Sequence, residues 1–228
     1  MTHLHYSRST ISVCILLTGL AACSNSGNDE NVPLISEGDD PAEPLFSATL
    51  FDEDSSTIDN PLFPMTPGAL LIYEGTSDEG ETERVEIHVS HQTRSVDGVD
   101  SRIAIAREFL DGEMVEEAFD WFAQDTDGNV WYMGEASNDY ENGAIASTQG
   151  SWESGADVEN VGQVASAGII MKATPVLGDQ YRQEEYPGVA EDSAQVVDLD
   201  SPQTLANGQS YSTVKILEWN PLESDSSE

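Results

Sequence analysis

The sequence contains very few basic residues. Lysine and arginine together number 8 against 43 aspartates and glutamates, which gives a formal net charge of -35 at pH 7. A chain with this charge is repelled by nucleic acids and by anionic lipid head groups, so neither class is expected as a partner. Because the carboxylates are spread along the whole chain, they favour adaptation to high salt, in which ions screen their mutual repulsion. A cation-rich outer surface and a cation-binding role are the alternative explanations.

Cysteine is equally scarce, since Cys14 and Cys23 are the only two. Cys14 lies in the apolar run 11–20, which is shorter than the roughly 20 residues that a membrane-spanning helix needs. A polar start with one basic residue, Arg8, precedes the run, and this is typical of a signal peptide over residues 1–22. We therefore expect a mature body without a disulfide, a thiolate metal site or a cysteine nucleophile.

Small residues precede the second cysteine in the sequence Leu20-Ala21-Ala22-Cys23. These residues resemble the lipobox of bacterial lipoproteins. The resemblance implies cleavage before Cys23, attachment of diacylglycerol to its thiol and acylation of its amino group, which together make a stable membrane anchor. Ser24, where some lipoproteins have aspartate, is compatible with transfer to the outer membrane. We thus expect a protein of the outer membrane or cell envelope that faces the periplasm or the surface.

Composition divides the rest of the chain near residue 60. Residues 23–60 are rich in polar, acidic, glycine and proline residues and contain no base, so we expect an acidic flexible tether, with 45–51 docking as an edge strand. Residues 61–228 carry short alternating or apolar runs separated by turn pairs such as Asp97-Gly98, which predicts hairpins. The expected fold is all-β, a single antiparallel meander that forms a barrel-like or sandwich domain. The expected strands are 69–74, 84–91, 101–107, 114–123, 129–135, 144–152, 167–173, 194–199 and 211–218, with one or two helical turns at 178–185.

The segment 118–135, AFDWFAQDTDGNVWYMGE, is the most fully specified stretch, and we expect the rest of the body to pack around it. Aromatic strand formers flank a turn that contains Asp127-Gly128-Asn129, which predicts a hairpin. Asp125, Asp127 and Asn129 occupy alternate positions and could supply oxygen ligands to calcium. A helix-loop-helix calcium loop has glycine sixth and glutamate twelfth, whereas this segment has Gly128 fourth and Ala136 twelfth. A solvated hairpin turn is therefore the alternative interpretation.

The sequence contains neither a Gly-x-Ser-x-Gly elbow for a serine nucleophile nor a glycine-rich phosphate loop. No catalytic residue is assigned on this basis. Carboxylates beside aromatic residues are the candidates for paired acid chemistry on a glycoside, namely Glu135, Glu153, Glu184 and Glu191. The further candidates for ligand binding are Arg182 and four aromatic residues, whose alternative role is core packing: Trp121, Trp131, Tyr132 and Trp152.

Five segments of the body are similar to a family of bacterial secreted and lipoprotein-type domains of uncharacterised function. They are NPLFPMTPG, FDWFAQDTDGNVWYMGE, GSWESGA, YRQEEYPGVAED and TVKILEWNPLE. The resemblance covers most of residues 60–223 and implies a common β fold and an extracytoplasmic setting, but no activity. Relatives continue past the position of Leu222 with a lysine- and tyrosine-rich strand. The resemblance therefore implies a missing final strand, which would leave an open edge or an accessible cavity mouth.

These observations together predict a membrane-anchored lipoprotein whose β body binds a small molecule or another envelope component without turnover. A carbohydrate-active enzyme that uses Glu135 and Glu184 is one alternative. The other is a structural module stabilised by calcium at Asp125 and Asp127, and calcium is accordingly the one cofactor considered.

Overall fold

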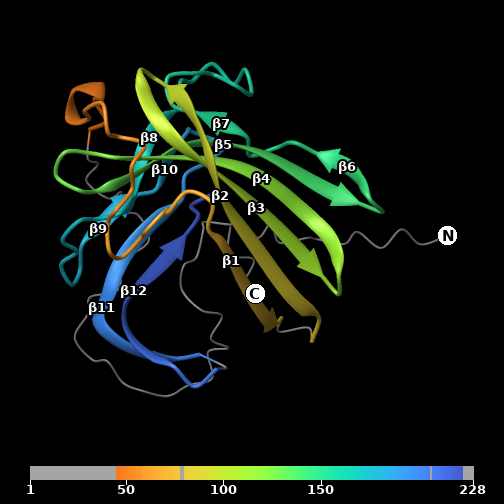
Figure 1. Cartoon of the computed structure of the whole chain (residues 1–228). Helices are drawn as coiled ribbons and strands as arrows, with labels where there is room; N and C mark the ends of the chain where they lie inside the picture. The colour runs from red at the N-terminus through yellow and green to blue at the C-terminus, as the bar shows by residue number, and fades with distance from the viewer. Residues whose placement is uncertain (1–44, 78–79, 206, 223–228) are drawn as a thin grey trace.

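The computed structural model describes residues 45–77, 80–205 and 207–222. Within these residues the chain forms strands, one short 3-10 turn and no α-helix, which confirms the all-β prediction (Figure 1). In chain order the elements are η1 (Ala48–Leu50), β1 (Leu70–Thr76), β2 (Thr82–Val96), β3 (Val99–Leu110), β4 (Glu113–Gln124), β5 (Val130–Glu141), β6 (Ala144–Ser147), β7 (Trp152–Glu153), β8 (Ser166–Met171), β9 (Gln180–Arg182), β10 (Glu184–Glu185), β11 (Ser193–Thr204) and β12 (Ser210–Trp219).

The strands form one large antiparallel sheet and one small one. The 9-stranded sheet has the order β1-β2-β3-β4-β5-β8-β10, with β6 and β7 also paired to β5, and the 3-stranded sheet has the order β12-β11-β9. Figure 1 shows the large sheet curling into a half-barrel, with the long strands β2 to β5 at its centre and the small sheet to one side. Because β1 to β5 follow one another in space as in sequence, the predicted antiparallel meander is confirmed.

Two-residue turns set the register of this meander. Asp97-Gly98 joins β2 to β3, Asp111-Gly112 joins β3 to β4, and Asn142-Gly143 joins β5 to β6. Both residues of each pair have positive φ, between 47° and 84°. Such turns match the right-handed twist of the strands, and aspartate, asparagine and glycine are the residues that adopt them at least cost.

Two of the predicted elements are wrong in detail. The expected helical turns at 178–185 are instead the short strands β9 and β10, because this segment pairs with β11 and β8. The N–H groups of Gln183 and Glu184 both donate to the Asp192 carbonyl, at 2.8 and 3.1 Å. The expected strand 144–152 is interrupted by a turn at Gly150, with φ of 89°, and is divided into β6 and β7.

The middle of the large sheet is buried on both faces. Alternate residues of β4 and β5 point to two separate clusters of apolar side chains. Ala118, Phe122 and Tyr132 belong to the first cluster, while Trp121 and Trp131 belong to the second. We call the face of the large sheet that carries the first cluster the inner face and the other the outer face. The prediction that the body packs around 118–135 is therefore confirmed, and the alternation of the strand explains why one segment serves two cores.

The packed body begins upstream of the predicted boundary at Pro61. Phe46 and Phe51 lie 5.8 and 6.0 Å from the Trp131 ring, between centroids, and Ile58 is 5% exposed. The segment 45–51 docks on the body as expected, but it does so through the 3-10 turn η1 and not as an edge strand. Apolar burial of the aromatic side chains explains why this segment is held against the sheet.

Candidate functional site

The side chain of Asp125 holds the central hairpin turn together. Its Oδ1 accepts hydrogen bonds from the main-chain N–H groups of Asp127, at 3.0 Å, and Asn129, at 2.8 Å. Its Oδ2 accepts from the Asn129 side-chain amide and the Trp131 indole, both at 2.8 Å. The Asn129 side-chain oxygen accepts from the Ala173 N–H at 3.0 Å. Because N–H donors engage these oxygens, the geometry favours the hairpin turn over a calcium loop.

The surroundings of this turn are acidic. A polar cavity of about 400 Å³ lies beside it and is lined in part by Asp52, Asp54, Asp59 and Asp125. Asp127, the other aspartate among the predicted calcium ligands, is exposed. Across the part of the chain that the structure describes, no group of three or more His, Cys, Asp or Glu side chains is arranged to hold a metal ion.

The four aromatic residues predicted to bind ligand lie in the core. Trp121, Trp131, Tyr132 and Trp152 are at most 4% exposed. Tyr132 stacks on Phe122 with ring centroids 4.9 Å apart and meets Trp152 edge-on at 5.3 Å. The structure therefore gives these rings the alternative role, core packing, instead of an accessible binding platform.

Carboxylates gather around Tyr132 on the inner face of the half-barrel. The Tyr132 hydroxyl donates to Asp120 Oδ1 at 2.7 Å, and the Trp152 indole donates to Glu184 Oε1 at 3.3 Å. Asp120 on β4 lies directly across from Glu135 on β5, and Glu135 is repelled by both Glu184 and Asp120. Asp120 and Glu184 are 1% and 3% exposed. The structure thus brings the predicted pair Glu135 and Glu184 together and adds Asp120 to it.

Burial raises the pKa of these carboxyl groups and so favours their protonated form. Loss of water raises the pKa of Asp120 from 3.8 to about 7; the hydrogen bond from Tyr132 opposes this rise, and repulsion by Glu116 adds to it. Burial, followed by repulsion from Glu184 and Asp120, raises the pKa of Glu135 well above its usual value. Burial and then repulsion from Asp192 do the same for the pKa of Glu184. Such groups could act as proton donors near neutral pH.

The row of acids continues along the inner face. Glu108 and Glu116 lie opposite each other on β3 and β4, and Asp139 follows in the same row on β5. Burial, with repulsion from Glu116 and Glu83, raises the pKa of Glu108 to about 8. Burial also raises the pKa of Glu116, whose Oε1 accepts from the Ser137 hydroxyl at 2.9 Å. The inner face therefore combines apolar packing with carboxyl groups that favour the neutral form.

The remaining predicted site residues lie elsewhere. Glu153 lies opposite Gly134, one residue along from the pair formed by Glu135 and Trp152. Its side chain therefore points to the other face of the sheet from Glu135, where it forms an ion pair with Arg94. Glu191 accepts a hydrogen bond from the Gly188 N–H at 2.7 Å. Arg182 lies in β9, opposite Ser193 of the small sheet. Of these three residues, Glu153 lies on the face of the sheet opposite to the acid cluster.

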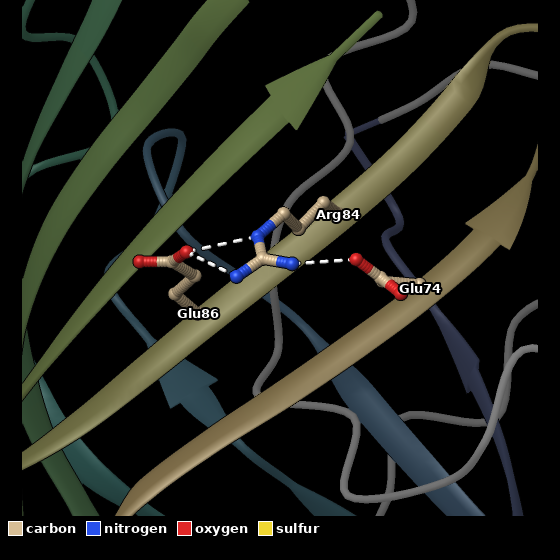
Figure 2. A network of polar contacts seen from close by, with 3 residues as sticks. All are labelled: Glu74, Arg84 and Glu86. Atoms are coloured by element: carbon tan, nitrogen blue, oxygen red, sulfur yellow. Dashed lines mark hydrogen bonds and ion pairs between the residues drawn. The ribbon is translucent and has the colours of Figure 1, made fainter. Parts of the chain in front are cut away.

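Ion pairs connect several basic residues to neighbouring strands. Arg84 of β2 lies between Glu74 of β1 and Glu86 of β2, at 2.5 and 2.7 Å (Figure 2). Arg107 is 2.8 Å from Glu117 across the pair β3 and β4. The outer face of these strands therefore carries ion pairs, whereas the inner face carries the acids described above.

Sequence reasoning missed Asp120, which the structure places at the centre of the acid cluster. In sequence it is one of many acids, and it lies in the first strand of the predicted hairpin. One signal points inward, because Asp120 shares its face with Ala118 and Phe122, which are apolar. An acid between apolar neighbours of the same face is a sign of a buried carboxyl group.

Comparisons with models of known protein families, with curated proteins and with solved structures found no match. Among the residues described, no helix is long and apolar enough to cross a membrane. Cys23 and the predicted signal peptide lie outside the described residues, so lipid attachment stays a prediction.

Proposed function

We propose that this protein is a lipid-anchored lipoprotein of the bacterial cell envelope whose β body is a non-catalytic binding or interaction module. Its anchor is the lipidated Cys23, and its setting is the outer membrane or cell envelope. Membership of the uncharacterised family of secreted domains is part of the same proposal. The partner is a small molecule or another envelope component, and the net charge of -35 argues against nucleic acid.

The observation that carries the binding role is the open edge of the large sheet. Within the described residues β1 pairs with β2 alone, so the half-barrel ends on a strand with one free side. Two apolar side chains of this strand, Leu70 and Ile72, are 54% and 47% exposed. Exposed apolar edge strands are sites at which other chains add, and soluble proteins usually block them.

The anchor is tested by labelling cells with a fatty acid that carries an alkyne group. We expect label on the full chain and recovery with membranes. Cys23→Ser should lose both, whereas Cys14→Ser, which changes the other cysteine, should keep both. Equal labelling of the two variants, or membrane recovery that survives Cys23→Ser, would contradict lipid anchoring at Cys23.

A carbohydrate-active enzyme is the second candidate, and one observation favours it. Glu135 and Glu184 repel each other within a cluster that favours protonated carboxyl groups, as a general acid requires. Glu135→Gln and Glu184→Gln should then abolish hydrolysis of chromogenic glycosides. Glu153→Gln is the matched control, because this residue leaves the opposite face of the sheet. Absence of hydrolysis by the wild type, or activity that survives both changes, removes this candidate.

A further inference from the structure

The free side of β1 presents main-chain groups at alternate residues. The Val89 N–H donates to the Ala69 carbonyl at 3.0 Å, and beyond the other end of the strand the Ser77 N–H donates to the Glu81 carbonyl at 2.9 Å. Both bonds involve odd-numbered residues on the β1 side. Since antiparallel strands bond through alternate residues, the N–H and C=O groups of Leu70, Ile72 and Glu74 point away from β2.

Nothing within β1 interrupts this edge. Its pairing with β2 runs without a register shift from Leu70 opposite His88 to Thr76 opposite Thr82. The pairs β2–β3, β3–β4 and β4–β5 each contain a shift. The strand also lacks proline and lysine, which natural edge strands use against unwanted pairing. The edge is therefore regular enough to accept another strand along its length.

The side chains of β1 divide between the two faces. Leu71 and Tyr73 pack against the inner cluster, so Leu70, Ile72 and Glu74 stand on the outer face. Leu70 and Ile72 are the exposed apolar pair described above. A strand added at this edge would place its own alternate side chains beside them, and apolar residues there would remove them from water.

Arg84 forms an ion pair with Glu74, the charged residue of β1. Figure 2 shows its guanidinium above β2, between Glu86 and Glu74, with the Glu74 carboxylate directed toward it. The ion pair thus draws Glu74 toward β2 and away from the free side. The Glu74 side chain still has 65% exposure, so it can meet a second cation that approaches from the free side.

We propose that the free edge of β1 binds an extended segment of another polypeptide, which adds to the sheet as a strand, covers Leu70 and Ile72 with apolar side chains, and places lysine or arginine opposite Glu74. The inference rests on the proposed role as a binding module and specifies its partner. Main-chain hydrogen bonds would supply register and the alternate side chains would supply specificity.

Charge decides against a second copy of this chain as the occupant. Each copy carries a formal net charge of -35, so two copies repel each other, and they would also bring together two edges of the same sign. A basic segment is attracted by the same field. The attraction should raise the rate of association and should weaken as salt is added.

Binding is tested with the full chain and a fluorescently labelled seven-residue peptide. Two valines and one lysine occupy alternate positions of the peptide, so that they share one face of an extended strand, and the other positions are threonine. Two comparison peptides carry glutamate for lysine, or proline at the central position, which keeps the charge but removes a main-chain donor. Fluorescence anisotropy should show binding of the first peptide at low salt. Each comparison peptide should bind at least about tenfold more weakly, and the deficit of the glutamate peptide should shrink in molar salt.

Variants of the protein provide the reciprocal test. Ile72→Pro removes an N–H that points away from β2, so it should abolish binding while the pairing with β2 persists. Ile72→Ala should weaken binding about three- to tenfold, whereas Ile145→Ala, at another exposed strand residue, should leave it unchanged. Equal binding of the lysine and proline peptides would overturn strand addition, because charge alone would then explain the affinity.

Three other results would also overturn the inference. Equal binding of the lysine and glutamate peptides would remove the basic partner. Dimerisation of the chain in molar salt, lost in Ile72→Pro, would make a second copy the occupant. Failure of the peptide to bind to a chain whose Cys23 is lipidated would reject the basic strand as partner, but it would not contradict the proposal of an envelope lipoprotein. Peptide binding by a chain that is not lipidated in cells would support the strand partner and contradict the lipid anchor.

Discussion

Replacing Asp120 by asparagine should stabilise the protein at alkaline pH. In the native state burial raises the pKa of Asp120 from 3.8 to about 7, so the folded protein keeps this proton when the unfolded chain has released it. Between these two pH values the native state binds more protons than the unfolded state. The free energy of unfolding therefore falls as pH rises through this window and levels off above it.

The magnitude follows from the size of the pKa difference. A rise from 3.8 to about 7 is about three units, and each unit corresponds to about 1.4 kcal/mol, so ionisation of Asp120 can cost the native state up to about 4 kcal/mol at pH 8. Asparagine keeps an oxygen that can accept from Tyr132, but its amide must also find an acceptor. We therefore expect Asp120→Asn to gain about 1–3 kcal/mol over wild type at pH 8 and little at pH 4.5.

Urea unfolding followed by tryptophan fluorescence measures both values. The experiments are run in molar sodium chloride, which screens repulsion between surface carboxylates but acts little on buried ones. Asp127→Asn, which removes an exposed carboxylate from the neighbouring turn, is the matched control and should follow the wild-type pH profile. If Asp120→Asn destabilised the protein equally at both pH values, or kept the wild-type slope, the reasoning would be refuted.

Three further predictions concern the hairpin and its packing. Asp125→Ala should lower the free energy of unfolding by about 2–4 kcal/mol, because four N–H donors lose their acceptor. A loss below about 1 kcal/mol, measured by urea unfolding, would contradict this prediction. Millimolar calcium in molar salt should leave the melting temperature unchanged, and a rise that Asp127→Ala abolishes would instead establish a calcium site. Gly134→Ala should lower the free energy of unfolding by more than about 3 kcal/mol, because the new Cβ would lie 2.4 Å from the Trp152 carbonyl oxygen. Gly143→Ala, where the new Cβ meets open space, should lower it by about 1 kcal/mol. Equal melting temperatures of the two variants would contradict this difference.

Local sequence was sufficient to predict the strands β1 to β5 and the turns between them. Pairs such as Asp97-Gly98 demand positive φ and lie between alternating runs, so the meander from β1 to β5 could be predicted from neighbouring residues alone. The segment 178–185 could not, because its conformation is set by pairing with β8 and β11, which are remote in sequence. Tertiary pairing overrides weak local preference in such short segments.

The candidate site was only partly predictable for the same reason. Proximity to aromatic residues made Glu135 and Glu184 candidates, and the structure places both in one group of interacting carboxylates. Asp120 was missed because its burial depends on the tertiary fold and not on its neighbours in sequence. Spacing left both a calcium site and a hairpin turn open at Asp125, because it does not reveal that the turn folds its own N–H groups onto the carboxylate.

Amide hydrogen exchange of β1 shows whether the large sheet ends on an open edge that is available to a partner. In the purified full chain we expect slow exchange at Leu71, Tyr73 and Gly75, which face β2, and fast exchange at Leu70, Ile72 and Glu74. Addition of the basic strand peptide should slow exchange at the second group. Slow exchange at all six amides without peptide, or no change on its addition, would contradict the account.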